Sequence, residues 1–301
     1  MAQSNTTNFF VTALLTISLS SSGFALLHFN LIGYGYTFFL LVPLCIGYFL
    51  GKKPTWKTSS IFAVLLGLVA FFYLVITAQL EGLFCIVTLL PLIMVLIFLG
   101  AWLGWGIREG LKNKDSKNNE LKLAMYPLLI LLFSGTIEHY FSEKYDYNKV
   151  DSQMFLPYSK EIVFDYIKSV DTLDSNRPLL FKLGLSVPQK CILENETVGA
   201  KRTCYFKEGT IEEKVTEIKR GEILRMDVIK YGLPGRKWLK FQEAIYLFEP
   251  KDKGTIITRI TSYKTELKPR FYWKFWEEKA IEAEHEYVLE DLRRRLGQKH
   301  L

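Results

Sequence analysis

Residues 201–219, KRTCYFKEGTIEEKVTEIK, contain two segments in which apolar and polar side chains alternate. Alternation with a period of two is typical of a β-strand with one buried face, and Glu208-Gly209 is typical of a turn. The stretch therefore predicts an antiparallel hairpin with strands at 201–207 and 210–219. The same alternation places Arg202, Cys204 and Phe206 on one face of the first strand.

The sequence around this hairpin continues the pattern. Further strands are predicted at 150–157, 189–193, 223–231, 240–249 and 255–264. Short helices are predicted after the N-cap residue Ser159 and at 177–183, and a long helix from Pro269 to about Leu296. One strand, two short helices, six consecutive antiparallel strands and a long last helix describe an α+β helix-grip. In this fold a curved antiparallel sheet wraps around the last helix, with a cavity between them.

Charge is distributed very unevenly along the chain. There are 38 basic and 31 acidic residues, yet only Lys52, Lys53, Lys57 and Glu81 fall in the first 107 positions. A helix that spans a bilayer needs about 20 mostly apolar residues. Spans are predicted at 9–29, 32–51, 59–80 and 83–106, with a fifth candidate at 122–141, which contains Glu138 and His139. Residues 1–142 are therefore predicted to form an α-helical transmembrane bundle of four or five spans, and residues 143–301 a water-soluble domain.

The orientation of the predicted bundle follows from its basic loops. Lysines at 52, 53 and 57 lie between spans two and three, and a second basic loop covers 108–122. Basic loops favour the cytoplasmic side, so the N-terminus is also expected in the cytoplasm of a plasma or inner membrane. Five spans would make residues 143–301 extracytoplasmic, and four would make them cytoplasmic.

The order of these elements resembles the START-like superfamily, also called the polyketide cyclase or SRPBCC group, over about residues 150–296. The local sequence looks like an uncharacterised membrane-anchored subgroup at Val198-Gly-Ala-Lys-Arg-Thr-Cys-Tyr-Phe-Lys-Glu-Gly209, Glu213-Lys-Val-Thr-Glu217, Pro269-Arg-Phe-Tyr-Trp273, His285 and Glu81-Gly-Leu-Phe-Cys85. The resemblance implies a helix-grip. It does not select a function, because the superfamily includes lipid carriers, hormone receptors, cyclases and modules of unknown role.

A candidate cavity is predicted between the hairpin and the last helix. With the turn at Glu208-Gly209, Cys204 pairs with Glu213 and Arg202 pairs with Val215, so Arg202 and Glu213 are diagonal neighbours. Ile281, His285, Val288 and Leu292 have the spacing of one buried helical face. The residues expected to line the cavity are Arg202, Cys204, Phe206, Glu213, Val215, Ile281, His285 and Val288.

Three interpretations of these polar groups remain open. Arg202, Glu213 and His285 would orient the polar end of a hydrophobic ligand. Alternatively, His285 or Glu213 would act as a general acid or base. The third interpretation, which the sequence favours, is a structural ion pair of Arg202 with Glu213 and a local hydrogen bond of His285. No nucleophile or phosphate-binding loop is recognised, so no catalytic residue or cofactor is assigned.

The cysteines and the net charge limit the remaining classes of function. Cys191 and Cys204 flank the turn at 197–198 symmetrically, so a disulfide between them is an alternative to the favoured unpaired thiols. Four Cys and four His show no zinc-binding spacing, and no metal is expected. The net charge of +7 does not indicate nucleic acid, because the two basic loops contain eight of the 38 basic residues and the other 30 are interspersed with 26 acidic residues from Glu143 onward.

The first functional hypothesis is a non-enzymatic, membrane-anchored START-like domain that binds a hydrophobic small molecule or lipid. Its expected partners are membrane lipids and that ligand. One alternative is a membrane-bound cyclase- or hydrolase-type enzyme that uses the same cavity. Another is a structural or sensory module with a filled cavity.

Overall fold

The computed structural model describes residues 2–28, 35–52, 58–111, 129–130, 133–138, 140, 145–233 and 238–299. These residues form two compact units. One consists of helices and is called the helical unit below. The other is built on a β-sheet and is called the sheet unit. Each is described by itself.

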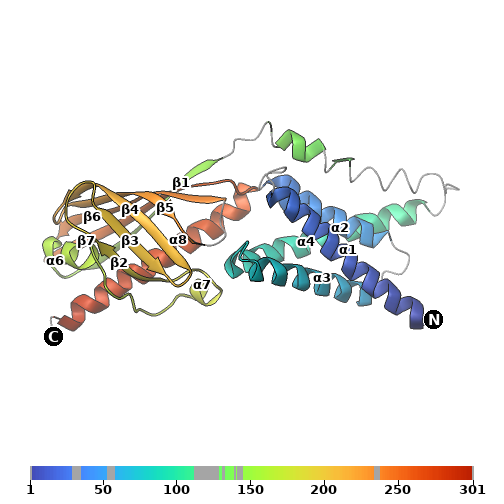
Figure 1. Ribbon diagram of the computed structural model, residues 1–301, viewed down its shortest axis with the longest axis horizontal. Coiled ribbons are helices and arrows are strands. Elements are labelled where there is room, and N and C mark those ends of the chain that lie inside the picture. Colours follow the sequence, from blue (N-terminus) through green and yellow to red (C-terminus); the bar gives the residue numbers. More distant parts are fainter. Residues whose placement is uncertain are drawn as a thin grey trace. The chain divides into compact units, whose positions relative to one another are not determined.

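The sheet unit contains one seven-stranded antiparallel sheet, in the order β1-β7-β6-β5-β4-β3-β2. Its strands are β1 (Asp146–Leu156), β2 (Pro188–Leu193), β3 (Lys201–Phe206), β4 (Gly209–Lys219), β5 (Ile223–Tyr231), β6 (Leu239–Lys251) and β7 (Gly254–Thr265). Consecutive strands from β2 to β7 pair with one another, and β1 pairs with β7. The long helix α8 (Arg270–Lys299) runs along the curved sheet (Figure 1). This arrangement confirms the predicted helix-grip.

Aromatic side chains form much of the core of the sheet unit. Tyr246, Tyr263, Tyr287 and Phe164 are among its largest fully buried side chains. Such rings contribute a large apolar area and pack edge to face. Phe164 in α6 (Lys160–Ile167) meets Phe248 of β6 with ring centroids 5.5 Å apart.

The short helix α7 (Leu179–Lys182) packs against α8 in the same way. The Phe181 ring lies 5.2 Å from the Tyr287 ring, with an edge-to-face geometry. The predicted helix stripe Ile281, His285, Val288 and Leu292 is buried, with at most 5% exposure. Helix α8 is therefore held on its buried side by the sheet and α7.

The predicted register between β3 and β4 was wrong by two residues. Phe206 pairs with Gly209 and Arg202 pairs directly with Glu213, so the turn consists of Lys207 and Glu208. The glycine lies in the strand because a Cβ there would be 2.1 Å from the carbonyl oxygen of Gly232. Gly209 is therefore needed for the close approach of its backbone to that of Gly232 and not for the turn. The predicted register was wrong because the glycine was assigned to the turn.

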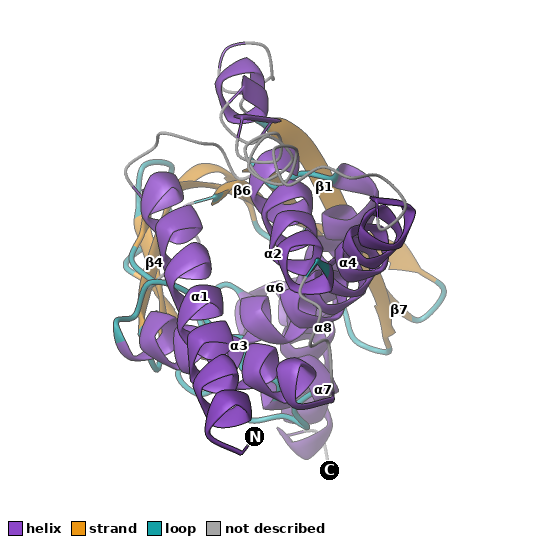
Figure 2. Ribbon diagram, turned by 90° about the vertical axis from the view of Figure 1, so that its right-hand side faces the viewer, coloured by secondary structure: helices purple, strands orange, loops and turns teal. Residues whose placement is uncertain are grey.

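The helical unit contains α1 (Ala2–His28), the π-helix η1 (Thr37–Leu41), α2 (Val42–Gly51), α3 (Thr58–Thr77) and α4 (Leu83–Leu111). Helix α1 lies beside α3 (Figure 2). The buried core of the unit comprises Ile46, Leu50, Val64, Leu68, Phe71, Phe72, Val75, Ile86 and Ile97. Apolar side chains also cover much of the outside of these helices, including Val69, Phe98 and Trp102.

The predicted bundle of four or five spans is not supported. Within the described residues, two helices are long and apolar enough to cross a membrane, Ser60–Thr77 and Leu83–Gly110. The apolar helices Phe9–Ala25 and Thr37–Gly51 have 10–17 residues. Phe9–Ala25 is the apolar part of the longer helix α1, and at about 1.5 Å per residue these apolar stretches extend about 26 Å at most, less than a bilayer core of about 30 Å.

Several predictions for this half concern residues that the structure does not describe. The candidate span at 122–141 lies largely outside the described residues. The basic loops at 53–57 and 112–122 also lie outside them, so the predicted orientation stays a prediction.

Helices α2 and α4 approach each other through two glycine pairs. Gly47 and Gly51 lie one turn apart in α2, and Gly100 and Gly104 lie one turn apart in α4. A Cβ at Gly47 would be 2.0 Å from the carbonyl oxygen of Ile97. A Cβ at Gly100 would be 2.2 Å from the carbonyl oxygen of Leu44. Small residues spaced by four are typical of helices that pack closely within a membrane.

Candidate functional site

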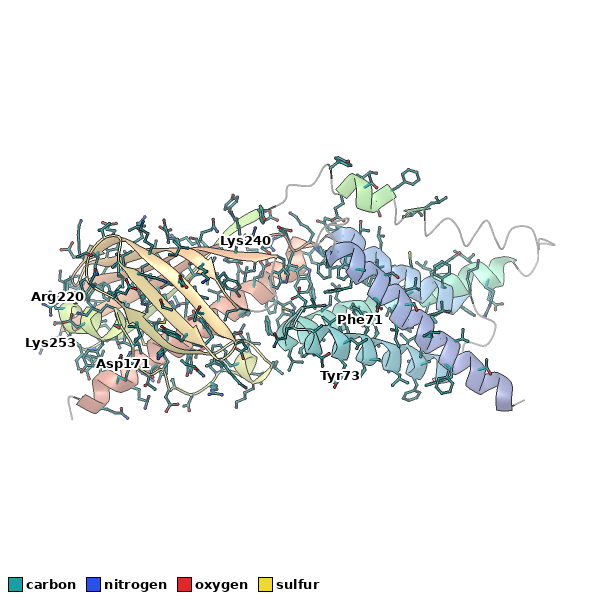
Figure 3. The ribbon with its side chains drawn as sticks, in the orientation of Figure 1. Phe71, Tyr73, Asp171, Arg220, Lys240 and Lys253 are labelled. Atoms are coloured by element: carbon teal, nitrogen blue, oxygen red, sulfur yellow. A yellow bond between two sulfur atoms is a disulfide. The ribbon has the colours of Figure 1, made fainter. Side chains whose placement is uncertain are left out.

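Ionisable side chains gather on the side of the sheet that contacts α8, called the inner face here. Arg202 of β3, Glu213 of β4, Arg259 of β7, and Glu284 and His285 of α8 meet there. Other charged side chains of the sheet unit, such as Arg220, Lys240 and Lys253, are exposed and lie at its periphery (Figure 3). Arg202, Glu213 and Arg259 are buried, so their charges interact more strongly than they would in water.

Arg202 is a buried side chain whose three nitrogens all have acceptors. Nη1 donates to Oε2 of Glu213 at 2.9 Å. Nε donates to the carbonyl oxygen of Lys168 at 3.1 Å, and Nη2 to that of Ile167 at 3.4 Å. These carbonyls lie at the end of α6, so Arg202 joins β3, β4 and α6. Burial is the largest single influence and lowers the pKa of Arg202, but the charge and hydrogen bond of Glu213 together with the nearby Tyr246 outweigh it, so the pKa is raised.

Arg259 is a second buried arginine, and only one of its nitrogens is used. Nη2 lies 2.9 Å from Oε1 and 2.7 Å from Oε2 of Glu284. Nε and Nη1 are buried and have no hydrogen-bond partner among the described residues. Burial is the largest single influence and lowers the pKa of Arg259, but Glu284, Tyr246 and Glu213 together outweigh it, so the pKa is raised.

The Tyr246 ring contacts both arginines. The guanidinium carbon Cζ lies 5.8 Å from the ring centroid in Arg202 and 5.4 Å in Arg259. A cation over an aromatic face is attracted by the ring quadrupole. One aromatic ring therefore connects the ion pair with Glu213 to the ion pair with Glu284.

His285 is fully buried, and both of its ring nitrogens have hydroxyl partners. Nδ1 lies 2.9 Å from Oγ of Ser152, and Nε2 lies 2.8 Å from Oγ1 of Thr261. Burial, followed by the positive charge of Arg259, lowers the pKa of His285 to about 2. The imidazole is therefore neutral at physiological pH, with one nitrogen donating and the other accepting.

The other buried acids of α8 also have partners. Glu277 accepts hydrogen bonds from Oγ1 of Thr265 at 2.8 Å and from the hydroxyl of Tyr263 at 3.3 Å. Asp291 accepts from Nε of Arg295 at 2.7 Å and from the backbone N–H of Asp174 at 3.0 Å. These bonds satisfy the polar groups that burial of α8 removes from water.

The structure brings together the charged residues that the sequence identified and adds others. Arg202 contacts Glu213, whereas His285 is bonded to Ser152 and Thr261. The remaining predicted cavity residues Cys204, Val215, Ile281 and Val288 are buried, and Phe206 is half-buried. The sequence pattern did not identify Ser152, Tyr246, Arg259, Thr261 and Glu284. One sequence signal for Arg259 and Thr261 was present. They lie at every second position of β7 together with the apolar residues Ile257 and Tyr263, and therefore on the same face.

The structure joins Cys191 and Cys204 in a disulfide, the alternative that the sequence did not favour. The two residues are directly opposite each other on β2 and β3, and both are buried. Val170 forms an isolated bridge to Cys191. The disulfide therefore fixes the β2 edge of the sheet next to Arg202 of β3.

Removing this disulfide is expected to destabilise the sheet unit by about 2 kcal/mol, at the low end for native disulfides because the closed loop is short. The change is the double variant Cys191→Ala, Cys204→Ala, and the measurement is urea unfolding of the full chain in neutral detergent. The matched control is Cys45→Ala, Cys85→Ala, which leaves the disulfide intact. Iodoacetamide should add two groups to the denatured wild-type chain before reduction and four after it. Four additions before reduction would contradict the disulfide.

Comparison with known proteins gives matches at the level of structure alone. No family model matches the sequence, and no curated protein matches it. Protein Ms6760 from Mycobacterium smegmatis is 10% identical, with a TM-score of 0.34, over 50% of this chain and 92% of its own. Ginseng major latex-like protein 151 from Panax ginseng is 12% identical, with a TM-score of 0.33, over 50% and 97%. A protein from Thermus thermophilus, TTHA0849, is 15% identical, with a TM-score of 0.31, over 50% and 99%.

Proposed function

We propose that this protein is a membrane-anchored, START-like helix-grip protein whose sheet unit binds a hydrophobic small molecule or a lipid. The observation that carries the proposal is the composition of the inner face. It is formed by apolar side chains such as Val215, Met226 and Val288, with a few charged groups that converge near Tyr246. Sites for small hydrophobic ligands combine an apolar surface with a small number of placed polar groups.

The proposed anchor is the helical unit, within a division of the chain into residues 1–142 and 143–301. Helices α3 and α4 have the length and composition of membrane spans. The glycine contacts between α2 and α4 support close helix packing within lipid. A tether next to the bilayer raises the effective concentration of a membrane-borne ligand.

The proposed compartment of the sheet unit is the extracytoplasmic side. The Cys191–Cys204 disulfide favours this side, because disulfides persist in oxidising compartments. With a cytoplasmic N-terminus, this placement requires an odd number of membrane crossings.

The contacts of the polar groups weigh against an enzyme that uses them for proton transfer. Both nitrogens of His285 are already hydrogen-bonded, and its lowered pKa leaves it neutral across the physiological range. Glu213 is bound to Arg202. A general acid or base works best with a pKa near the operating pH. The second candidate function is a structural or sensory module with a filled grip, which is favoured by the many satisfied polar groups on α8.

Native mass spectrometry of the full-length protein tests the proposal. We expect one hydrophobic compound per chain to remain bound after purification in neutral detergent, and lipid extraction to identify it. The variant Ile281→Trp, which adds volume at a residue only 5% exposed, should lose the compound. The matched control Phe275→Trp changes a residue of the same helix that is 53% exposed and should retain it. A wild-type protein without any bound compound would favour the filled-grip module.

A further inference from the structure

Two buried donors of Arg259, Nε and Nη1, have no acceptor among the described residues. Almost all buried polar groups in proteins are hydrogen-bonded. Leaving a buried donor unsatisfied costs about 1–3 kcal/mol, and more for a charged group. Two such donors on one side chain indicate that an acceptor from another molecule belongs beside Arg259.

Arg202 shows that the fold can give every nitrogen of a buried arginine an acceptor. Its three nitrogens bond to Glu213 and to two backbone carbonyls. Arg259 contacts the same Tyr246 ring and is also buried, yet Glu284 occupies only its Nη2. The two buried arginines therefore differ in one respect: every nitrogen of Arg202 has an acceptor, whereas two nitrogens of Arg259 have none among the described residues.

The neighbours of Arg259 do not supply the missing acceptors. In the sheet, Ser152 of β1 and Tyr246 of β6 are directly opposite Arg259. The Ser152 hydroxyl is bonded to His285, and Tyr246 presents its ring face to the guanidinium. From α8, Glu284 binds Nη2, and His285 is neutral. The nearby charges are therefore Arg259, Glu284, and the pair of Arg202 with Glu213.

We propose that Arg259 binds the anionic head group, a carboxylate or a phosphate, of the hydrophobic molecule in the grip. This inference rests on the proposed function. Hydrogen bonds from a guanidinium to an anionic oxygen are about twice as strong as bonds between neutral groups. A carboxylate or phosphate also carries more than one acceptor oxygen, and Arg259 offers more than one unused nitrogen. The apolar part of the same molecule contacts the apolar residues of the inner face.

The test compares three probes with the same sixteen-carbon chain. Palmitate carries a carboxylate, hexadecyl phosphate carries a phosphate, and hexadecanol carries a neutral hydroxyl. Each is titrated into the full-length protein in neutral detergent after removal of endogenous ligand, and binding is measured by native mass spectrometry. We expect at least one anionic probe to bind about tenfold more tightly than hexadecanol, a factor that corresponds to about 1.4 kcal/mol. The anionic probe that binds more tightly shows whether the head group is a carboxylate or a phosphate.

Substitutions at Arg259 locate the preference. Arg259→Lys keeps a positive charge beside Glu284 but removes the guanidinium donors, and we expect it to lose the tenfold preference. The double variant Arg259→Met, Glu284→Met removes both charges together, so neither is left buried and uncompensated. It should bind palmitate and hexadecyl phosphate no more tightly than it binds hexadecanol. The matched control is Arg225→Lys on β5, an outward arginine that is 41% exposed and pairs with Glu243.

The outcomes distinguish this inference from the proposed function. Equal binding of hexadecanol and both anions to the wild type would overturn the head-group inference and leave the proposed function standing. An anion preference that survives in both Arg259 variants would also overturn the inference. Failure of every probe to bind the wild type would overturn the inference and the proposed function together.

Discussion

Replacing Glu213 with Gln is expected to destabilise the sheet unit by about 3 kcal/mol, because it removes one charge of a buried ion pair. Arg202 would remain 2% exposed, with its charge no longer balanced by the carboxylate at 2.9 Å. The amide oxygen of Gln can still accept a hydrogen bond, which places the effect at the low end of the range for broken buried pairs. The measurement is urea unfolding of the full-length protein, followed by hydrogen exchange in peptides from β3 and β4.

The neighbouring residue Glu212 supplies the matched control. It lies on the opposite face of the same strand and pairs with Lys201 and Lys230 at distances of 2.8 Å and 3.3 Å. Exposed ion pairs of this kind contribute little to stability, so Glu212→Gln should have only a small effect. Equal effects of the two substitutions would show that burial does not set the contribution of Glu213.

A second comparison separates the ion pair from the other bonds of Arg202. The double variant Arg202→Met, Glu213→Leu removes both charges but also the bonds from Arg202 to the end of α6. We expect it to be less destabilised than the sum of the two single variants, because neither charge is then left alone. Strict additivity would contradict direct coupling between Arg202 and Glu213.

The helix-grip was predictable from the sequence because its signals are local. Alternation identified the strands, and the spacing of Ile281, His285, Val288 and Leu292 identified the buried face of α8. The register of β3 and β4 was not predictable in the same way. A glycine after a glutamate resembles a turn, whereas Gly209 is required by the carbonyl oxygen of Gly232, which is distant in sequence. A shift of two residues preserves the face of every side chain, so the error changed partners but not faces.

Only part of the candidate site was predictable. Arg202 and Glu213 were found because they are the charged members of an otherwise apolar strand face. Arg259 was missed because β7 is covered on both faces, and Thr258 and Ile260 on the other face are also buried. Strand β7 therefore lacks the alternation of buried and exposed side chains that marks an inner face. Glu284 was missed because a glutamate beside a helical stripe is normally exposed, and its contact with β7 depends on tertiary structure.

The helical half shows a different limit of the sequence. Absence of charge in residues 9–51 indicated two spans, but it does not measure helix length. The apolar stretches of the helices there, Phe9–Ala25 and Thr37–Gly51, are shorter than the two helices that qualify as spans. The repeated spacing Gly47–Gly51 and Gly100–Gly104 is a sequence signal for the close packing of α2 and α4.

Lowering the pH from 7 to 4.5 is expected to destabilise the sheet unit through His285 by about 3 kcal/mol. The ordinary histidine pKa is 6.5, and in the folded protein it is lowered to about 2 by burial and by Arg259. Above pH 6.5 the imidazole is neutral in both the folded and the unfolded chain, so the contribution to stability is complete. Below pH 6.5 the unfolded chain binds a proton that the folded protein does not. The free energy of unfolding therefore falls by about 1.4 kcal/mol per pH unit until the pH approaches 2.

The variant His285→Gln isolates this contribution from the titration of carboxylates. Glutamine can donate to and accept from the Ser152 and Thr261 hydroxyls but does not take up a proton in this range. Urea unfolding of both proteins at pH 7.0, 6.0, 5.0 and 4.5, read from hydrogen exchange in β1 and β7 peptides, gives the difference in slope. The wild type should lose stability more steeply than the variant below pH 6.5. Parallel slopes would mean that His285 accepts a proton while folded, and the acid–base role that its contacts disfavour would then be supported.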